Sequence, residues 1–375
     1  MALPSPDDAL GSTAGGGSLK CAITLLFVVQ ETARPKHPSL RTLIQGCDLD
    51  AEGTRAAIDQ LIQFPDDPVS AAILTAWTCK GETGDELAVA AAHLLPKSIP
   101  LSIGGDFIDT CGTGGDGMET FNISTATAIV VAGCGVRVVK HGNRAASSRS
   151  GSADVLATLG VRTDWPADLL PRQLEEVGVV FCLAPQFHPV LAGIGPLRRK
   201  LGFRSLFNAL GPLLNPARSP RQVIGVGQAK WLDTLAGAAS RLGKMKVTVI
   251  RGDDGLDEVT LSGPTAVKVV EGSTVRDMRI TPADLGLQRV ETSALAAGGP
   301  AESAQRIEAL LRCQDESAEA IVAANTGLAL WTAGKAETPR QGVDIARHAL
   351  ESGAALKVLE RWRSWNPDSG PGEPR

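Results

Sequence analysis

The feature of this sequence that most restricts its fold is a change of pattern near residue 108. Between about residues 36 and 103, apolar residues recur at helical spacing, interrupted at Pro65, Pro68, Gly81 and Gly84. Beyond this point, short apolar runs alternate with helical stretches. Such alternation predicts α/β architecture with a central, mostly parallel sheet. The expected strands cover residues 136–139, 177–183, 223–226 and 247–250.

The same pattern predicts how the chain is divided. At 375 residues it is longer than one hydrophobic core usually serves. We expect a flexible extension over residues 1–35, a small helical domain over 36–104 to which 193–216 return, a larger α/β domain built from 105–192 and 217–365, and a disordered tail over 366–375.

Composition limits the ligands and the location. The net charge is −4, so there is no global basic field and nucleic acid is not an expected partner. A local basic pocket for a phosphorylated small molecule is compatible with this charge. The seven scattered cysteines contain no Cys-x-x-Cys pair, which argues against a disulfide framework or a zinc site. No apolar run approaches the roughly 18 residues of a membrane span, and no convincing leader is present, so we expect a cytoplasmic protein without membrane contact.

A glycine-rich loop, Asp109-Thr-Cys-Gly112-Thr-Gly-Gly115-Asp116, follows an apolar segment. Glycines let backbone N–H groups approach an anion closely, so the loop fits pyrophosphate, although a simple tight turn is the alternative. Asn122-Ile-Ser124-Thr125 then opens an alanine-rich helix. These side chains could be helix caps. Directly after a glycine loop, the helix N-terminus favours a phosphate site.

A basic and polar cluster covers residues 140–154, directly after the strand expected to end at Val139. It contains three cations, a histidine, an asparagine and four serines. Lysine, serine hydroxyls and backbone N–H groups can wrap a phosphate, while a solvated surface loop is the alternative. His141 fits either a general base or a residue that defines the shape of the site.

An acidic motif, Asp254-Gly-Leu-Asp257-Glu258, follows the last expected strand. Adjacent carboxylates suit hard cations that prefer oxygen ligands, and magnesium takes one or two carboxylates together with substrate phosphates. A solvated acidic turn is the alternative. A pyrophosphate site elsewhere in the chain favours the metal hypothesis.

Taken together and in this order, the motifs resemble those of anthranilate phosphoribosyltransferases. The resemblance runs from about residue 38 to 360 and includes Lys80-Gly-Glu-Thr83, the stretch 202–216 and Asn325-x-Gly. It implies a helical domain beside an α/β domain of the nucleoside phosphorylase and phosphoribosyltransferase class. It also implies a homodimer formed through the helical domain, with phosphoribosyl pyrophosphate and anthranilate as substrates and Mg²⁺ as cofactor.

The resemblance also implies roles for individual residues. Metal positions would be Ser124, Asp257 and Glu258. Anthranilate would meet Asn143 and Arg198, with His141, His188 and Pro212 lining its route. The remaining expected substrate contacts are Gly112, Gly115, Asp116, Thr120, Asn122, Thr125, Lys140, Gly142, Arg144, Ser147, Ser148 and Ser152.

The expected reaction transfers the phosphoribosyl group to the anthranilate amine and releases pyrophosphate, as in tryptophan biosynthesis. No residue is a certain catalyst; Asn143 and Arg198 would position the substrate. Arg251, Ser205 and the Leu94-Leu-Pro96 stretch depart from the family pattern where the aromatic substrate's route could be tuned. The alternatives are a phosphoribosyltransferase or nucleoside phosphorylase for another aromatic substrate, and a non-catalytic nucleic-acid-binding paralogue.

Overall fold

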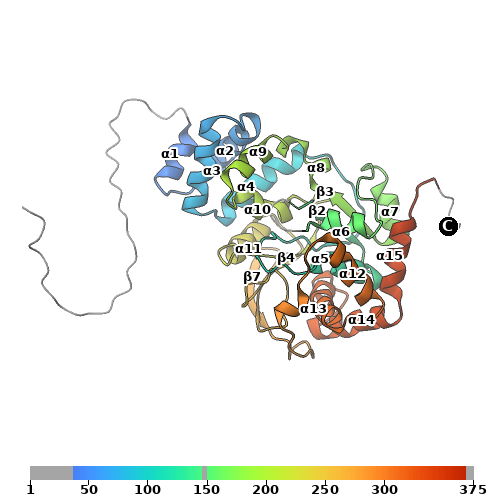
Figure 1. Ribbon diagram of the computed structural model, residues 1–375. Helices are drawn as coiled ribbons and strands as arrows, with labels where there is room; N and C mark the ends of the chain where they lie inside the picture. Colours follow the sequence, from blue (N-terminus) through green and yellow to red (C-terminus); the bar gives the residue numbers. More distant parts are fainter. Residues whose placement is uncertain (1–36, 146–149, 369–375) are drawn as a thin grey trace, which may run out of the picture. The chain divides into compact units, whose positions relative to one another are not determined.

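The computed structural model describes residues 37–145 and 150–368. The predicted extension 1–35, Ser147, Ser148 and most of the predicted tail lie outside the described residues. The described residues belong to one compact unit that begins at His37 (Figure 1). Whether they divide into the two domains expected from the sequence stays a prediction.

Four helices form the first part: α1 Pro38–Ile44, α2 Ala51–Gln63, α3 Pro68–Lys80 and α4 Gly84–Leu94. Their starts follow from local chemistry, because the side chains of Asp50, Asp67 and Thr83 each accept a hydrogen bond from a backbone N–H of the first turn. Gly84 lets α4 lie close to α11 (Trp231–Arg241), since a Cβ atom there would stand 3.1 Å from the Thr234 carbonyl oxygen. The helical pattern predicted from the sequence is confirmed.

One seven-stranded sheet forms the centre, in the order β3-β2-β1-β4-β5-β6-β7. The first five strands in this order are parallel and the last two pair antiparallel, which confirms the mostly parallel sheet. Their bounds are β1 Ile108–Asp109, β2 Val138–Gly142, β3 Val179–Leu183, β4 Arg221–Gly225, β5 Lys246–Gly252, β6 Thr265–Glu271 and β7 Thr274–Ile280.

The hairpin β6–β7 was not expected from the sequence. Its strands join through a two-residue turn in which Gly272 has φ 59°. A glycine at this position matches the backbone twist of the flanking strands. Exposure explains why β7 was missed, because its residues show no buried apolar run; β6 has buried valines, so this reason does not apply to it.

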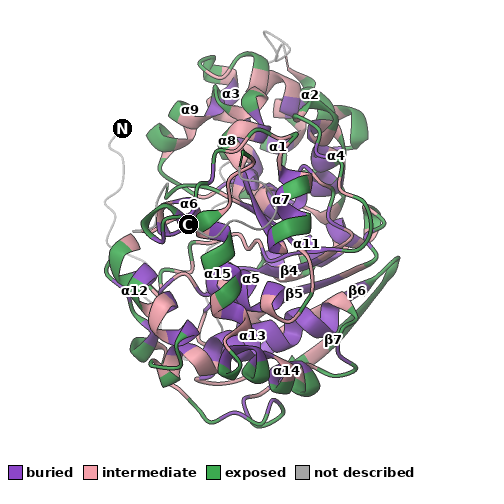
Figure 2. Cartoon of the chain, turned by 90° about the vertical axis from the view of Figure 1, so that its right-hand side faces the viewer, coloured by how far each residue is buried: buried purple, intermediate pink, exposed green. Residues whose placement is uncertain are grey.

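Strands β4 and β5 are largely buried (Figure 2), and alternate residues of the strands enter different cores. On β5, Val247 and Val249 join the cluster that contains α1–α4, whereas Ile250 joins the cluster of α5 (Ile123–Gly133) and α13 (Glu316–Ala333). On β3, Val180 packs with a third cluster and Val179 with that of α5. Successive side chains of a strand point to opposite faces, so the sheet is covered by helices on both sides.

The remaining helices connect the strands and close the fold. Four helices end the fold: α12 Pro300–Leu311, α13, α14 Pro339–Glu351 and α15 Ala354–Ser364. The others are α6 Ser152–Thr158, α7 Leu170–Val177, α8 Ala184–Phe187, α9 Ile194–Leu201 and α10 Leu206–Leu210, with 3-10 turns η1 Leu95–Lys97, η2 Pro189–Leu191, η3 Gly211–Leu214 and η4 Thr292–Leu295. Among the described residues, no helix has the length and apolarity to cross a membrane.

Candidate active site

The sequence motifs meet at one edge of the sheet. Parallel pairing of β2, β1, β4 and β5 places their carboxyl ends together. The glycine loop follows β1, the basic cluster begins in β2, and the acidic motif follows β5. In open α/β sheets, ligands bind outside the carboxyl ends of the strands.

The glycine loop rests on the turn that follows β4. The Thr113 N–H donates to the Gly225 carbonyl at 2.8 Å, and the Gly227 N–H donates to the Thr113 hydroxyl at 3.1 Å. A Cβ atom on Gly112 would stand 2.9 Å from the Gly225 oxygen. Because the two backbones touch, a larger residue at position 112 would push the loop off its support.

Two further glycines give the loop its curvature. Gly114 and Gly115 have φ values of 62° and 73°, in the left-handed region that favours glycine. A Cβ atom on Gly115 would also overlap the Arg204 guanidinium. The glycines are therefore required by the turn itself, and this requirement alone does not distinguish a phosphate loop from a tight turn.

The acidic motif lies against this loop. The Asp257 N–H donates to an Asp116 carboxylate oxygen at 3.3 Å. Burial raises the pKa of Asp257 to about 8, and the charge of Asp116 adds to the effect. Burial and the neighbouring Asp257 charge raise the pKa of Glu258 well above its usual range. Burial and the neighbouring carboxylates thus favour the protonated forms of both residues.

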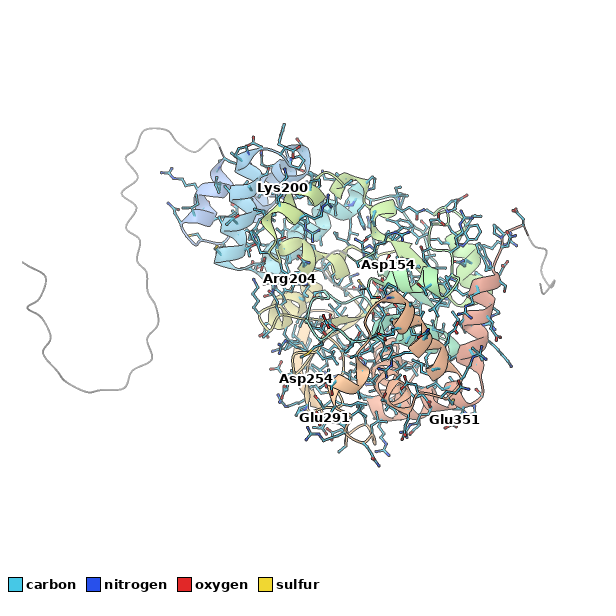
Figure 3. All side chains as sticks on the ribbon, viewed as in Figure 1. Asp154, Lys200, Arg204, Asp254, Glu291 and Glu351 are labelled. Atoms are coloured by element: carbon cyan, nitrogen blue, oxygen red, sulfur yellow. The ribbon has the colours of Figure 1, made fainter. Side chains whose placement is uncertain are left out.

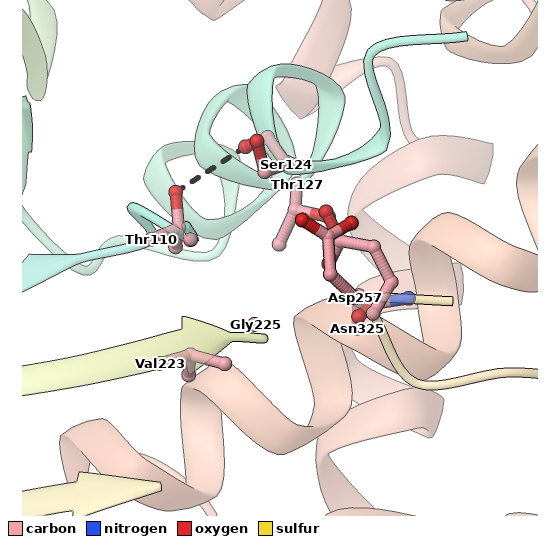
Figure 4. Close-up of a pocket in the computed structure, with 9 residues that line it drawn as sticks. Thr110, Ser124, Thr127, Val223, Gly225, Asp257 and Asn325 are labelled. Atoms are coloured by element: carbon pink, nitrogen blue, oxygen red, sulfur yellow. Dashed lines mark hydrogen bonds between the residues drawn. The ribbon is translucent and has the colours of Figure 1, made fainter. Parts of the chain in front are cut away.

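A small pocket opens between these carboxylates and the start of α5 (Figure 4). Its lining residues are Thr110, Gly112, Ser124, Thr127, Val223, Gly225, Asp257, Glu258 and Asn325. The described residues form no ion pair with Asp257 or Glu258 and contain no cluster of three or more metal-ligating side chains. The charges of Lys140 and Arg204 act on these carboxylates without pairing with them directly, so their oxygens remain available to Mg²⁺, which completes its coordination with water and substrate phosphates.

Lys140 brings a positive charge to the same place. Its side chain is buried, and Nζ donates to the Thr110 carbonyl at 2.9 Å and to the Ser124 hydroxyl at 3.2 Å. The Ser124 backbone N–H hydrogen-bonds with the Glu258 carboxylate. Ser124 therefore contacts both Lys140 and Glu258, so it lies between the proposed phosphate site and the proposed metal site.

The neighbours of Ser124 serve the start of α5. Asn122 makes no side-chain cap; instead its side-chain oxygen accepts a hydrogen bond from the Thr125 hydroxyl. Thr125 is buried, and Thr120 forms an isolated bridge with Ala296. The capping alternative is therefore wrong for Asn122, whereas no contact places Thr120 or Thr125 in the pocket.

Asp154, labelled in Figure 3, holds the ends of the loop that follows β2. Its carboxylate accepts hydrogen bonds from the N–H groups of Ala145 at 2.8 Å and Gly151 at 3.2 Å, and pairs with Arg144 at 3.4 Å. The Ser152 hydroxyl donates to the Asn143 carbonyl at 3.3 Å. Asn143, Arg144 and Ser152 thus shape the loop ends, and these contacts do not reach the acidic pair.

Two buried histidines, His141 and His188, lie next to each other. His141 Nδ1 is 3.0 Å from the Gly211 carbonyl, and His188 Nε2 is 2.8 Å from that of Leu214. Carbonyls only accept, so these nitrogens carry the protons, and His141 Nε2 and His188 Nδ1 remain buried acceptors without partners. Burial, assisted by His188, lowers the pKa of His141 to about 3. Such a weak base favours the shape-defining alternative.

Two arginines approach from the segment containing α9 and α10. Arg198 hydrogen-bonds Asn208 at 3.4 Å and lies over the Phe207 ring at 5.4 Å. Burial, and then the charge of Arg204, lower the pKa of Arg198. Arg204 donates to the Thr113 carbonyl at 2.7 Å, so it reaches the glycine loop directly.

The structure gathers some predicted residues and adds others. Gly112, Ser124, Asp257 and Glu258 line one pocket, with Asp116 and Lys140 beside them. Gly142 lies against Phe181 and Ser152, and Pro212 accepts a hydrogen bond through its carbonyl from Gln222. Sequence reasoning missed Thr110, Thr113 and Arg204, and gave Asn325 no role. The only signal for Asn325 was its place in a recognised motif.

Comparison with known proteins gives a consistent result. The family model described as "Glycosyl transferase family, a/b domain" matches residues 104–356. Anthranilate phosphoribosyltransferase of Moorella thermoacetica is 44% identical over 296 residues, which cover 79% of this chain and 87% of that protein. The crystal structure of the Thermus thermophilus enzyme has a TM-score of 0.80 at 38% identity and covers 87% of this chain and 98% of that one. The Saccharomyces cerevisiae enzyme in complex with PRPP and Mg has a TM-score of 0.78 at 27% identity, covering 86% and 95%.

Proposed function

Because this chain belongs to the anthranilate phosphoribosyltransferase family, we propose that it performs the family's reaction where the loops after β1, β2, β4 and β5 meet. The reaction transfers the phosphoribosyl group of 5-phosphoribosyl 1-pyrophosphate to anthranilate and releases pyrophosphate. The observation that carries the assignment is the junction of the glycine loop and the acidic loop, joined by the hydrogen bond between Asp257 and Asp116.

The phosphorylated substrate binds along the first two loops. The glycine loop offers backbone N–H groups at Gly112, Gly115 and Asp116, and α5 offers its N-terminus beside Ser124. Lys140 supplies the buried cation. Thr120, Asn122, Thr125, Ser147, Ser148 and Ser152 remain proposed contacts from the family pattern.

Asp257, Glu258 and Ser124 would hold Mg²⁺. The fit rests on the donor set, because the oxygens of these three residues line one pocket and the described residues form no ion pair with either carboxylate. When bound, the metal would neutralise charge that develops on the departing pyrophosphate. Lys140 and the loop N–H groups act in the same direction from the protein side.

Anthranilate binds on the side of the histidines and Arg198. The Arg198 guanidinium holds its carboxylate, and Asn143 orients the ring. His141 Nε2 and His188 Nδ1 are buried acceptors that suit the N–H groups of an aromatic amine. The amine is nucleophilic when neutral, so the low pKa of His141 is compatible with a site that needs no strong base before attack.

Anthranilate fluorescence tests this function. Purified protein should consume the fluorescence only when phosphoribosyl pyrophosphate and Mg²⁺ are both present, and chelator should stop the reaction. Folded protein that binds phosphoribosyl pyrophosphate but leaves the fluorescence unchanged would contradict the anthranilate assignment. Consumption of another aromatic acid in place of anthranilate would change the substrate assignment.

A homodimer through α1–α4 in the cytoplasm completes the proposal. Ile44, at the end of α1, and Phe64, just after α2, are 69% and 55% exposed, so both side chains are available for contact with a second subunit. Light scattering should give twice the chain mass. The double substitution Ile44→Glu, Phe64→Glu should halve it if these residues belong to the interface, and an unchanged mass would place the interface elsewhere.

A further inference from the structure

Arg204 lies on the short connection between α9 and α10, yet its side chain ends at a distant loop. Its Nη2 donates to the Thr113 carbonyl at 2.7 Å, across 91 residues of sequence. The guanidinium also occupies the space in which a Cβ atom of Gly115 would lie. One side chain thus touches the glycine loop at two neighbouring points.

The guanidinium is held from behind by an aromatic ring. It lies over the indole of Trp231, 5.3 Å from the ring centre, and Trp231 is fully buried. The indole N–H donates to Glu82 at 3.2 Å, and Lys230 pairs with the same carboxylate oxygen at 3.0 Å. The residues behind Arg204 are therefore themselves fixed, so the arginine has little freedom to leave the loop.

The charged residues that act on Arg204 belong to the proposed ligand site. Burial lowers the pKa of its guanidinium, and the carboxylates of Asp257 and Asp116 oppose that shift. Its Nε is enclosed and has no hydrogen-bond partner. Arg204 is thus placed for the loop and the carboxylates, at the cost of leaving one of its own donors unused.

We propose that Arg204 is a positioning residue that preorganises the glycine loop for the pyrophosphate of the substrate. The proposal rests on the function proposed above and deepens it. A loop with three glycines in four positions samples many conformations, and ordering it upon binding weakens affinity. The hydrogen bond to Thr113 and the contact above Gly115 restrict the loop before the ligand arrives.

The test compares Arg204→Ala with Arg199→Ala, a matched control on α9 whose side chain is exposed. Calorimetry with phosphoribosyl pyrophosphate and Mg²⁺ should show a Kd raised about tenfold or more in Arg204→Ala, since a hydrogen bond to a charged group is lost. The KM for phosphoribosyl pyrophosphate should rise in parallel, while that for anthranilate changes less than about twofold. The control should match the wild type.

Hydrogen exchange separates this role from general stability. Amides of residues 112–116 should exchange faster in Arg204→Ala, with strands β2 and β3 unchanged. Arg204→Lys should recover only part of the affinity, because an ammonium lacks the planar fork that spans two points. If Arg204→Ala does not fold, Arg204→Lys and Trp231→Phe take its place, and both should show the same effects more weakly.

Two results would overturn the proposal: an unchanged Kd with unchanged loop exchange, or an equal rise in the KM values of both substrates. Failure of the proposed function is distinguishable, since wild-type protein would then leave anthranilate unconsumed. The binding and exchange measurements use phosphoribosyl pyrophosphate alone with Mg²⁺ and decide the role of Arg204 either way.

Discussion

Glu86 on α4 and Glu258 beside the glycine loop are two carboxylates of the same chemistry, but their partners differ. Lys80 donates to both oxygens of Glu86 at 2.8 Å, and the Trp77 indole donates at 3.0 Å. The backbone N–H groups of Leu49 and Thr83 complete the set at 2.9 Å each. Every accepting position of Glu86 is used within the helices.

Glu258 has the opposite surroundings. After burial, the charge of Asp257 raises its pKa most, and Asp116 acts in the same direction, whereas Lys140 and the Ser124 N–H oppose them. The pKa values of the pair are raised, whereas hydrogen-bond donors surround Glu86. A buried charge with a complete set of partners is structural, and one that lacks them awaits a ligand. The comparison gives Lys80 and Thr83 a role in folding, because both donate to Glu86, although their motif accompanies the site motifs in the sequence.

The largest effect is expected from removing either carboxylate of the proposed metal site. Asp257→Asn or Glu258→Gln should lower kcat/KM by about a thousandfold or more, because metal neutralisation of the leaving group is lost. The metal-free thermal midpoint should stay equal or rise, since a like charge has been removed. Steady-state kinetics and thermal unfolding check both. A large fall in stability without loss of activity would assign the pair a structural role.

The structural side should respond in the reverse way. Glu86→Ala should reduce the free energy of unfolding by about 3–5 kcal/mol, because the buried ammonium of Lys80 loses its partner. The affinity of the folded protein for phosphoribosyl pyrophosphate and Mg²⁺ should not change. Denaturant titration measures the first quantity and calorimetry the second. Asp48→Ala is the control: this partner of Lys80 has a side chain 68% exposed, so its removal should cost less than about 1 kcal/mol.

Arg198 extends the comparison to a cation that awaits a ligand. Arg198→Ala should raise the KM for anthranilate roughly 10- to 100-fold, as expected for the loss of a charged hydrogen bond. The KM for phosphoribosyl pyrophosphate should change by less than about threefold. Initial rates at saturating concentrations of the other substrate separate the two. Equal increases would remove Arg198 from the anthranilate side of the site.

The smallest effect is a pH dependence of stability. The pKa of Asp257 is raised from 3.8 to about 8 in the folded state. Its protonated form therefore contributes to the free energy of unfolding fully below about pH 4, and this contribution is lost as the pH rises through about 8. Metal-free protein should therefore melt a few degrees lower at pH 9 than at pH 6. Asp257→Asn should flatten this slope. Identical slopes in variant and wild type would show that other groups set the dependence.

Much of the site could be predicted from the sequence because each of its motifs consists of adjacent residues. The glycine loop, the Ser124 helix start and the acidic motif each depend on a few adjacent residues, and the strands that present them are short apolar runs. Strand β6 was missed despite its buried valines, whereas β7 and Arg204 have no local pattern that would reveal them. β7 is mostly exposed, so it carries no apolar signal. Arg204 is one arginine among several in a basic, glycine-containing stretch, and only its contact with Thr113 distinguishes it.

The sequence by itself therefore determined the helical and α/β character of the chain, the glycines needed for a tight loop, and the chemistry of the motifs. Tertiary structure decided which motifs meet. Asp116 and Asp257 are 141 residues apart, and His141 and Gly211 are 70 apart, yet each pair is joined by a hydrogen bond. Backbone preferences and apolar periodicity act over one turn or one strand, whereas parallel strand order and packing between distant segments decide which side chains share a pocket.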